Sequence, residues 1–184
     1  MSDLKYDEPK ASKMPIVTLA SRVTILATLA VSMSLLKSNG VTYKQGPDDP
    51  VPFNYNDVVT YEYVFFGMVA GFGYNLLQVP FAMYFFFTKK RLINNNTFFE
   101  FEFYGDKICL TLLATVVGSL FGATVETRNR SLDIEDIDGY PAANYHLKVK
   151  EFCMMAYVSA GFLLIGFISS MVLSIVSSKA LAIK

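Results

Sequence analysis

Four long apolar segments constrain the fold of this chain more than any other feature. They cover residues 15–36, about 63–88, from about 98 or 105 to 125, and 152–178. Each has the ~20 residues that a helix needs to cross the hydrocarbon core of a bilayer, and lipid offers no hydrogen bonds to an open backbone. The runs do not alternate as transmembrane β-strands do. The sequence therefore predicts an all-α membrane protein, an antiparallel bundle of four transmembrane helices.

Polar segments connect the four predicted spans and contain most of the charged residues. They are an N-terminal tail at 1–14, connections at 37–62, 89–97 and 126–151, and a C-terminal tail at 179–184. The first span resembles a secretory signal, but it is long for one and an arginine interrupts it. We interpret it as a retained signal anchor, so that all four spans belong to one bundle.

Basic residues indicate the orientation of the bundle. The run Lys89-Lys90-Arg91 directly follows the second span, and basic connections stay on the cytosolic side. We expect both termini in the cytosol and the 37–62 and 126–151 connections outside. The sequon that begins at Asn129 then lies outside and is a possible glycosylation site. A glycan on the other sequon, at Asn95, would reverse this orientation.

Arg22 and Asp106 lie inside the predicted first and third spans, where a charge is costly and is usually paired or functional. Arg22 is seven residues after Pro15, and Asp106 is eight residues after Phe98. Both spans run in the same direction, so both residues lie roughly 10–12 Å deep at ~1.5 Å per residue. We therefore predict that Arg22 and Asp106 form an intramembrane charge pair. The alternative is that each reaches the cytosolic interface separately.

Small residues recur with a spacing of four in the second and third spans. This pattern permits close helix contact in membranes, either within one chain or between chains. The predicted helix-packing residues are Gly67, Gly71, Ala114, Gly118 and Gly122. Pro80 is expected to kink the second span, because proline removes one backbone hydrogen bond.

A search for catalytic and metal-binding patterns finds none. His146 is the single histidine, and no cysteine or histidine cluster has the spacing of a metal site. Glu100 and Glu102 are a possible carboxylate pair, but their aromatic neighbours favour an interfacial stretch. Cys109 and Cys153 are predicted to lie at different depths, too far apart for an internal disulfide. We therefore predict no enzyme, no cofactor and no metal.

Four passages resemble the plant CASP-like group of Casparian strip membrane domain proteins, a family similar in layout to MARVEL-type tetraspan proteins. They read LASRVTILATLAVSMSLL, YNDVVTYEYVFFGMVAGFGYNLLQ, YGDKICLTLLATVVGSLFGAT and YPAANYHLKVKEFCMMAYVSAGFLLIGFISSMVLS. The arginine of the family's first helix matches Arg22, and the aspartate of its third matches Asp106. Tyr74 and Gln78 also match. Casparian strip members carry a cysteine shortly before the one that matches Cys153, and this chain has none there, which favours the wider group.

The resemblance implies a plasma-membrane scaffold with no catalytic activity. Members of the family self-associate, or associate with related proteins, into membrane domains where cell-wall-modifying enzymes such as peroxidases gather. On this basis we expect a homo-oligomer or hetero-oligomer in the lipid bilayer and no nucleic-acid partner. The alternative is a small channel or transporter, or an accessory subunit of a transport complex, because intramembrane charges are also compatible with transport.

Overall fold

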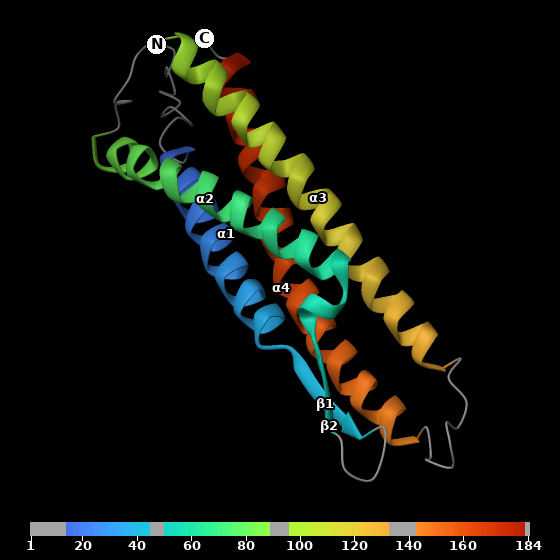
Figure 1. Ribbon diagram of the computed structural model, residues 1–184. Coiled ribbons are helices and arrows are strands. Elements are labelled where there is room, and N and C mark those ends of the chain that lie inside the picture. Colours follow the sequence, from blue (N-terminus) through green and yellow to red (C-terminus); the bar gives the residue numbers. More distant parts are fainter. Residues whose placement is uncertain (1–13, 45–49, 89–95, 133–142, 183–184) are drawn as a thin grey trace, which may run out of the picture.

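The computed structural model describes residues 14–44, 50–88, 96–132 and 143–182. Within these ranges it contains four long helices: α1 (Met14–Lys37), α2 (Val59–Thr88), α3 (Asn96–Leu132) and α4 (Ala143–Ala182). All four are long and apolar enough to cross a membrane, and successive helices run in opposite directions (Figure 1). The predicted fold class is thereby confirmed. The predicted N-terminal tail and the 89–97 connection lie almost wholly outside the described residues, whereas α4 continues to Ala182, through most of the predicted C-terminal tail at 179–184.

The bundle has two chemically different ends. We call the end that holds Met14 of α1 and Ala182 of α4 the terminal end, and the end that holds the short strands the hairpin end (Figure 1). α4 packs against both α1 and α3, and α2 packs against the same two helices. Every helix therefore contributes one face to the core and exposes the rest of its apolar surface, as lipid contact requires.

Helices α3 and α4 continue past the predicted span ends at 125 and 152. α3 reaches Leu132 and α4 begins at Ala143, so much of the predicted 126–151 loop is helical. Charged pairs at helical spacing accompany these extensions: Arg130 contacts Glu126 at 2.6 Å, and Lys148 contacts Glu151 at 2.8 Å. Such pairs support exposed helix turns, which explains why the helices do not end where hydrophobicity ends.

A two-stranded hairpin replaces part of the expected 37–62 loop. Strands β1 (Gly40–Lys44) and β2 (Pro50–Asn54) pair antiparallel, and the 3-10 helix η2 (Tyr55–Asp57) leads into α2. The ring of Phe53 lies 4.9 Å from that of Phe152 in α4, and Asn39 Nδ2 donates to the Phe152 carbonyl at 3.0 Å. The expectation of a plain loop was wrong because one apolar face of the hairpin packs against α4.

The centre of the bundle is apolar and tightly closed. Fully buried side chains from all four helices meet there, among them Leu29, Met68, Leu113 and Leu163. Ser32 and Ser159 form polar contacts across this layer: the Ser32 hydroxyl lies 2.9 Å from both the hydroxyl and the carbonyl oxygen of Ser159. Because Ser32 and Ser159 satisfy each other's hydrogen bonds, they join α1 to α4 without leaving either hydroxyl unpaired in the apolar layer.

Candidate functional site

The structure brings Arg22 and Asp106 together within one chain, towards the terminal end of the bundle. Arg22 on α1 is 0% exposed and Asp106 on α3 is 1% exposed. Arg22 Nη2 lies 3.3 Å from Asp106 Oδ1. The complete burial of Arg22 disagrees with the alternative in which it reaches the interface separately. A buried cation of this kind needs a partner, because desolvation of an unpaired charge costs several kcal/mol.

Two further side chains contact the Arg22 guanidinium. Nη2 also lies 3.3 Å from Glu102 Oε1, and Nη1 donates to Asn75 Oδ1 over 3.5 Å. Glu102 precedes Asp106 by four residues on α3, so the two carboxylates lie on the same helix face. The side chain of Glu102 is 19% exposed. Glu102 was expected to lie at the membrane interface. Its side chain is partly exposed, but it also binds the buried Arg22.

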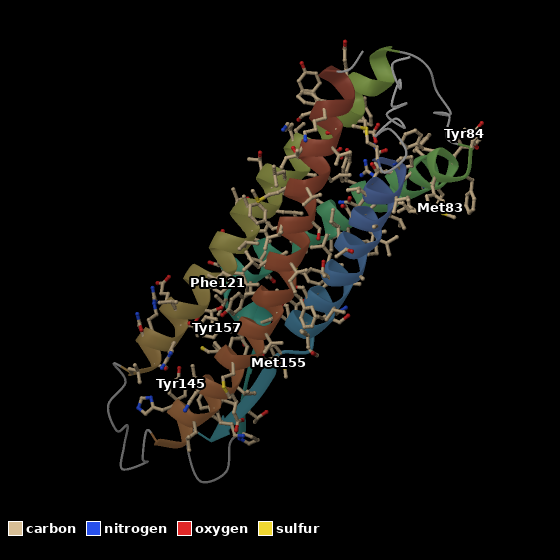
Figure 2. The ribbon with its side chains drawn as sticks, turned by 180° about the vertical axis from the view of Figure 1, so that it is seen from behind. Met83, Tyr84, Phe121, Tyr145, Met155 and Tyr157 are labelled. Atoms are coloured by element: carbon tan, nitrogen blue, oxygen red, sulfur yellow. The ribbon has the colours of Figure 1, made fainter. Side chains whose placement is uncertain are left out.

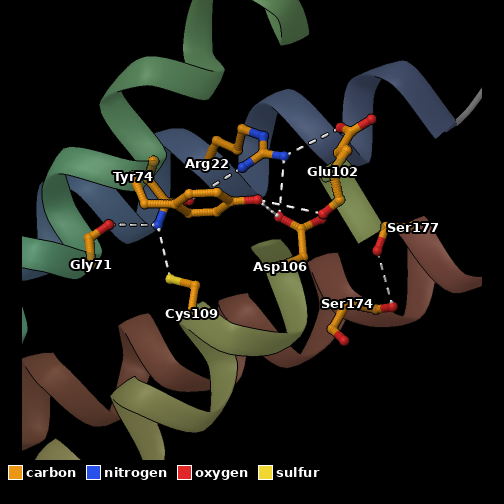
Figure 3. Close-up of polar contacts among 9 residues, drawn as sticks. Arg22, Gly71, Tyr74, Glu102, Asp106, Cys109, Ser174 and Ser177 are labelled. Carbon is orange, nitrogen blue, oxygen red and sulfur yellow. Dashed lines mark hydrogen bonds and ion pairs between the residues drawn. The ribbon is translucent and has the colours of Figure 1, made fainter. Parts of the chain in front are cut away.

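Tyr74 of α2 completes the contacts of Asp106. Its hydroxyl donates to Asp106 Oδ1 at 2.8 Å, and Arg22 Cζ lies 5.9 Å from the centre of its ring. A Cβ atom at Gly105 would come within 2.6 Å of the Tyr74 hydroxyl. The absence of a side chain at Gly105 therefore lets the tyrosine approach α3. We call Arg22, Tyr74, Asn75, Glu102 and Asp106 the charged centre (Figure 3).

Asn75 links the charged centre to the helices around it. Its side-chain amide donates to the Gly71 carbonyl at 2.9 Å and to Cys109 Sγ at 3.5 Å. Because its carbonyl oxygen accepts from Arg22, one amide side chain connects α1, α2 and α3. This bridging explains why a polar residue with no exposed surface is tolerated in the second span.

Several buried polar atoms near the charged centre have no hydrogen-bond partner within the part of the chain that the structure describes. They include Gln78 Oε1, Asp106 Oδ2 and Ser174 Oγ. Ser174 and Ser177 of α4 lie on the side of Asp106 away from Tyr74 (Figure 3). The site thus contains the Arg22–Asp106 ion pair and, beside it, buried polar atoms that could still form hydrogen bonds. No group of three or more metal-binding side chains occurs among the residues searched, which are the described ones.

The predicted helix-packing residues divide into two sets. A Cβ atom at Gly67 would meet the Val116 side chain, and one at Gly71 would lie 3.2 Å from Leu113. These two glycines therefore permit α2 to approach α3. On the outer face of α3, by contrast, Gly118 and Gly122 have open space around them, and Ala114 is exposed. Within the part of the chain that the structure describes, this second set therefore faces away from the bundle.

The remaining predicted positions are the two sequons and the two cysteines. Asn129 is exposed, but it lies in the last turns of α3 and not in a loop. Its modification stays a prediction. Cys109 and Cys153 are both free and buried, and Asn95 lies outside the described residues.

Sequence reasoning missed Tyr74, Asn75 and Glu102 as partners of Arg22. A usable signal exists: Tyr74 and Asn75 are polar side chains in the second span, and Glu102 has the four-residue helical spacing from Asp106. On α4, Ser170 and Ser174 are buried with the same spacing of four. A search for polar residues at equal depth on all four spans would have found this set.

Comparisons with known proteins place these features in a family context. The model of the Casparian strip membrane protein domain matches residues 11–169. CASP-like protein 4D1 of Ricinus communis is 30% identical over 171 residues, which is 93% of each chain. CASP-like protein 4D2 of Arabidopsis thaliana is 31% identical over 173 residues, 94% of this chain and 93% of the relative. None of the solved structures matches the chain.

Proposed function

Because the chain belongs to the Casparian strip membrane protein domain family, we propose that it is a non-catalytic scaffold of the plasma membrane. It self-associates, or associates with related proteins, into membrane domains. Both termini face the cytosol, and the hairpin end faces the cell wall. There the assembly gathers cell-wall-modifying enzymes such as peroxidases, or other membrane proteins.

One observation carries this proposal: the intramembrane charges are engaged inside a single chain. Arg22 contacts Asp106 and Glu102 through Nη2 and Asn75 through Nη1, so its guanidinium ties α1 to α2 and α3. Groups that stabilise each other in this way hold a bundle together. A stable bundle then presents fixed outer helix faces for contacts with other chains.

The outer face of α3 supports self-association. Ala114 and Gly118 are exposed there at a spacing of four, and a Cβ atom at Gly118 or Gly122 would meet nothing within 4 Å. Small residues at this spacing let two helix backbones come close in lipid. The face is thus suited to contact between chains.

The mass of the assembly tests the proposal. The full chain in nanodiscs should form species with masses that are multiples of 20.5 kDa, as measured by native mass spectrometry. Gly118→Leu should shift the distribution towards the monomer. Gly161→Leu is the matched control, because its Cβ would also meet open space but on α4, and it should leave the mass unchanged. A strictly monomeric wild-type chain at all concentrations would contradict self-association.

A transport function is the second candidate. It is favoured by Gln78 Oε1, Asp106 Oδ2 and Ser174 Oγ near the charged centre, which have no hydrogen-bond partner among the described residues. Towards the hairpin end, however, buried polar side chains such as Tyr61 and Thr124, which lie 3.0 Å apart, and Asn39, which donates to the Phe152 carbonyl, have partners. Such pairing leaves few groups to solvate an ion there. Ion flux into vesicles should therefore be absent for the wild type. Flux that disappears in Arg22→Ala while the assembly stays intact would favour transport instead.

A further inference from the structure

Helix α2 is longer than a membrane crossing requires. It has 30 residues from Val59 to Thr88, which corresponds to about 45 Å at ~1.5 Å per residue. The hydrocarbon core is only ~30 Å thick, and ~20 residues cross it. The part from Val59 to Pro80 already supplies that length. The last two turns, Phe81 to Thr88, therefore need a separate explanation.

Those two turns leave the direction of the bundle. In Figure 1 the helices α1, α3 and α4 are seen from the side, whereas the last turns of α2 are seen nearly end-on. The change follows Pro80, which lies inside the helix and cannot donate the backbone hydrogen bond that would hold it straight. Figure 2 shows Met83 and Tyr84 well outside the bundle. This segment consequently runs across the bundle axis.

The side chains of the segment are apolar and exposed on a broad face. Met83 is 45% exposed, Tyr84 39%, Phe86 37% and Phe87 75%. A straight α2 would carry these aromatic rings beyond the hydrocarbon core into water. A helix that turns across the bundle axis keeps them at the membrane, where aromatic side chains are enriched at the interface.

From this geometry we propose that Phe81–Thr88 is a membrane-surface segment that binds the lipid leaflet at the terminal end of the bundle. Its apolar face enters the boundary between headgroups and acyl chains, as the faces of interfacial helices do. Lys89, Lys90 and Arg91 follow directly in the sequence, and their charge complements anionic headgroups. This complementarity favours lipid over a second copy of the chain as the occupant.

Tryptophan fluorescence can measure the depth of this segment, because the chain contains no Trp. Single-Trp variants Leu76→Trp, Met83→Trp and Phe87→Trp are reconstituted in phosphatidylcholine nanodiscs with brominated acyl chains. Bromine placed near the headgroup or near the chain end quenches shallow or deep residues, respectively. Met83 and Phe87 are four residues apart and share a helix side. Leu76, seven residues before Met83, is the control on the spanning part of α2.

The two geometries give different depths. If the segment lies in the membrane surface, Trp at positions 83 and 87 is quenched most by shallow bromine and at equal depth, whereas Trp at 76 is deeper. A straight helix would separate positions 83 and 87 by ~6 Å along the membrane normal, which would overturn the proposal. Absence of quenching at both positions by every brominated lipid would also overturn it, because protein would then cover the segment. Far-UV circular dichroism verifies that each variant keeps its helices.

Discussion

A single buried arginine organises the polar contacts of three helices. Arg22 is the largest fully buried side chain among the described residues, and its guanidinium is within 3.5 Å of side chains from α2 and α3. A buried ion pair is not by itself strongly stabilising, because desolvation offsets much of the attraction. Removal of one partner, however, leaves the other charge buried and uncompensated. Single substitutions in the charged centre should therefore lower the free energy of unfolding much more than substitutions that remove both partners.

We expect Asp106→Ala to destabilise the bundle by about 3–5 kcal/mol, because Arg22 then loses its most buried anionic partner. The double variant Arg22→Met with Asp106→Leu should recover much of this loss, since it removes both charges at similar volume. Unfolding by denaturing detergent in mixed micelles measures the free energies. A loss for the double variant equal to the sum of the losses for Arg22→Met and Asp106→Leu alone would show that the two residues are energetically independent.

Gly105 should be a second sensitive position, although it carries no polar group. A Cβ atom there would lie 2.6 Å from the Tyr74 hydroxyl, so Gly105→Ala must displace the ring and break its hydrogen bond to Asp106. Bonds to charged groups contribute ~1.5–3 kcal/mol, and we expect a loss of about this size by the same unfolding assay. Gly118→Ala is the control, because its Cβ meets nothing within 4 Å. Equal behaviour of both alanines would refute the steric argument.

At the scale of elements, close approach of α2 and α3 depends on Gly67. An added Cβ would collide with Val116, whose branched side chain is stiff. We expect Gly67→Ala to cost about 1–3 kcal/mol, as overpacking does. Val116→Ala in the same chain should relieve most of this cost, while Gly73→Ala, which has open space around its Cβ, should have little effect. Failure of Val116→Ala to rescue would mean that the helices do not meet here.

Element boundaries show how far sequence reasoning reaches. Hydropathy predicted four spans because lipid requires continuous apolar helices. It did not predict that α3 would continue to Leu132, because charged residues such as Arg130 and Glu126 end a hydrophobic run without ending a helix. The hairpin was missed for another reason. Its strands are only five residues long and β2 contains two prolines, and its packing partner Phe152 is about a hundred positions away.

The site was predictable to a similar extent. Counting residues from the span starts placed Arg22 and Asp106 at equal depth, because α1 and α3 run in the same direction. Applied to Tyr74 from the expected span end at residue 88, the same count would place this residue 14 positions deep, because α2 runs in the opposite direction and continues for eight residues after Pro80. Uncharged polar residues near the ion pair, such as Asn75 and Ser174, give no electrostatic signal. They can be found from the sequence only when uncharged polar residues at equal depth on all four spans are considered together.

At the scale of the whole molecule, the two ends of the bundle are held by different forces. The charged centre joins α1, α2 and α3 at the terminal end. At the hairpin end, aromatic rings join α4 to the hairpin and to α2: Phe152 lies 4.9 Å from Phe53 and 5.7 Å from Tyr61, and Tyr43 lies 5.0 Å from Tyr145. Two separate clusters of this kind make partial opening of one end possible while the other stays closed.

Hydrogen exchange followed by mass spectrometry in nanodiscs should resolve these two ends. Asp106→Ala is expected to raise amide exchange in the first turns of α1 and α3, because the charged centre anchors them. Amide exchange in β1 and β2 should stay unchanged. Phe152→Ala should do the reverse, since it removes the ring against which Phe53 packs. The apolar layer around Leu29 and Leu113, together with the Ser32–Ser159 contact, separates the two effects. Uniform acceleration of exchange in both variants would mean that the bundle opens as one cooperative unit, and the two-ended description would then be wrong.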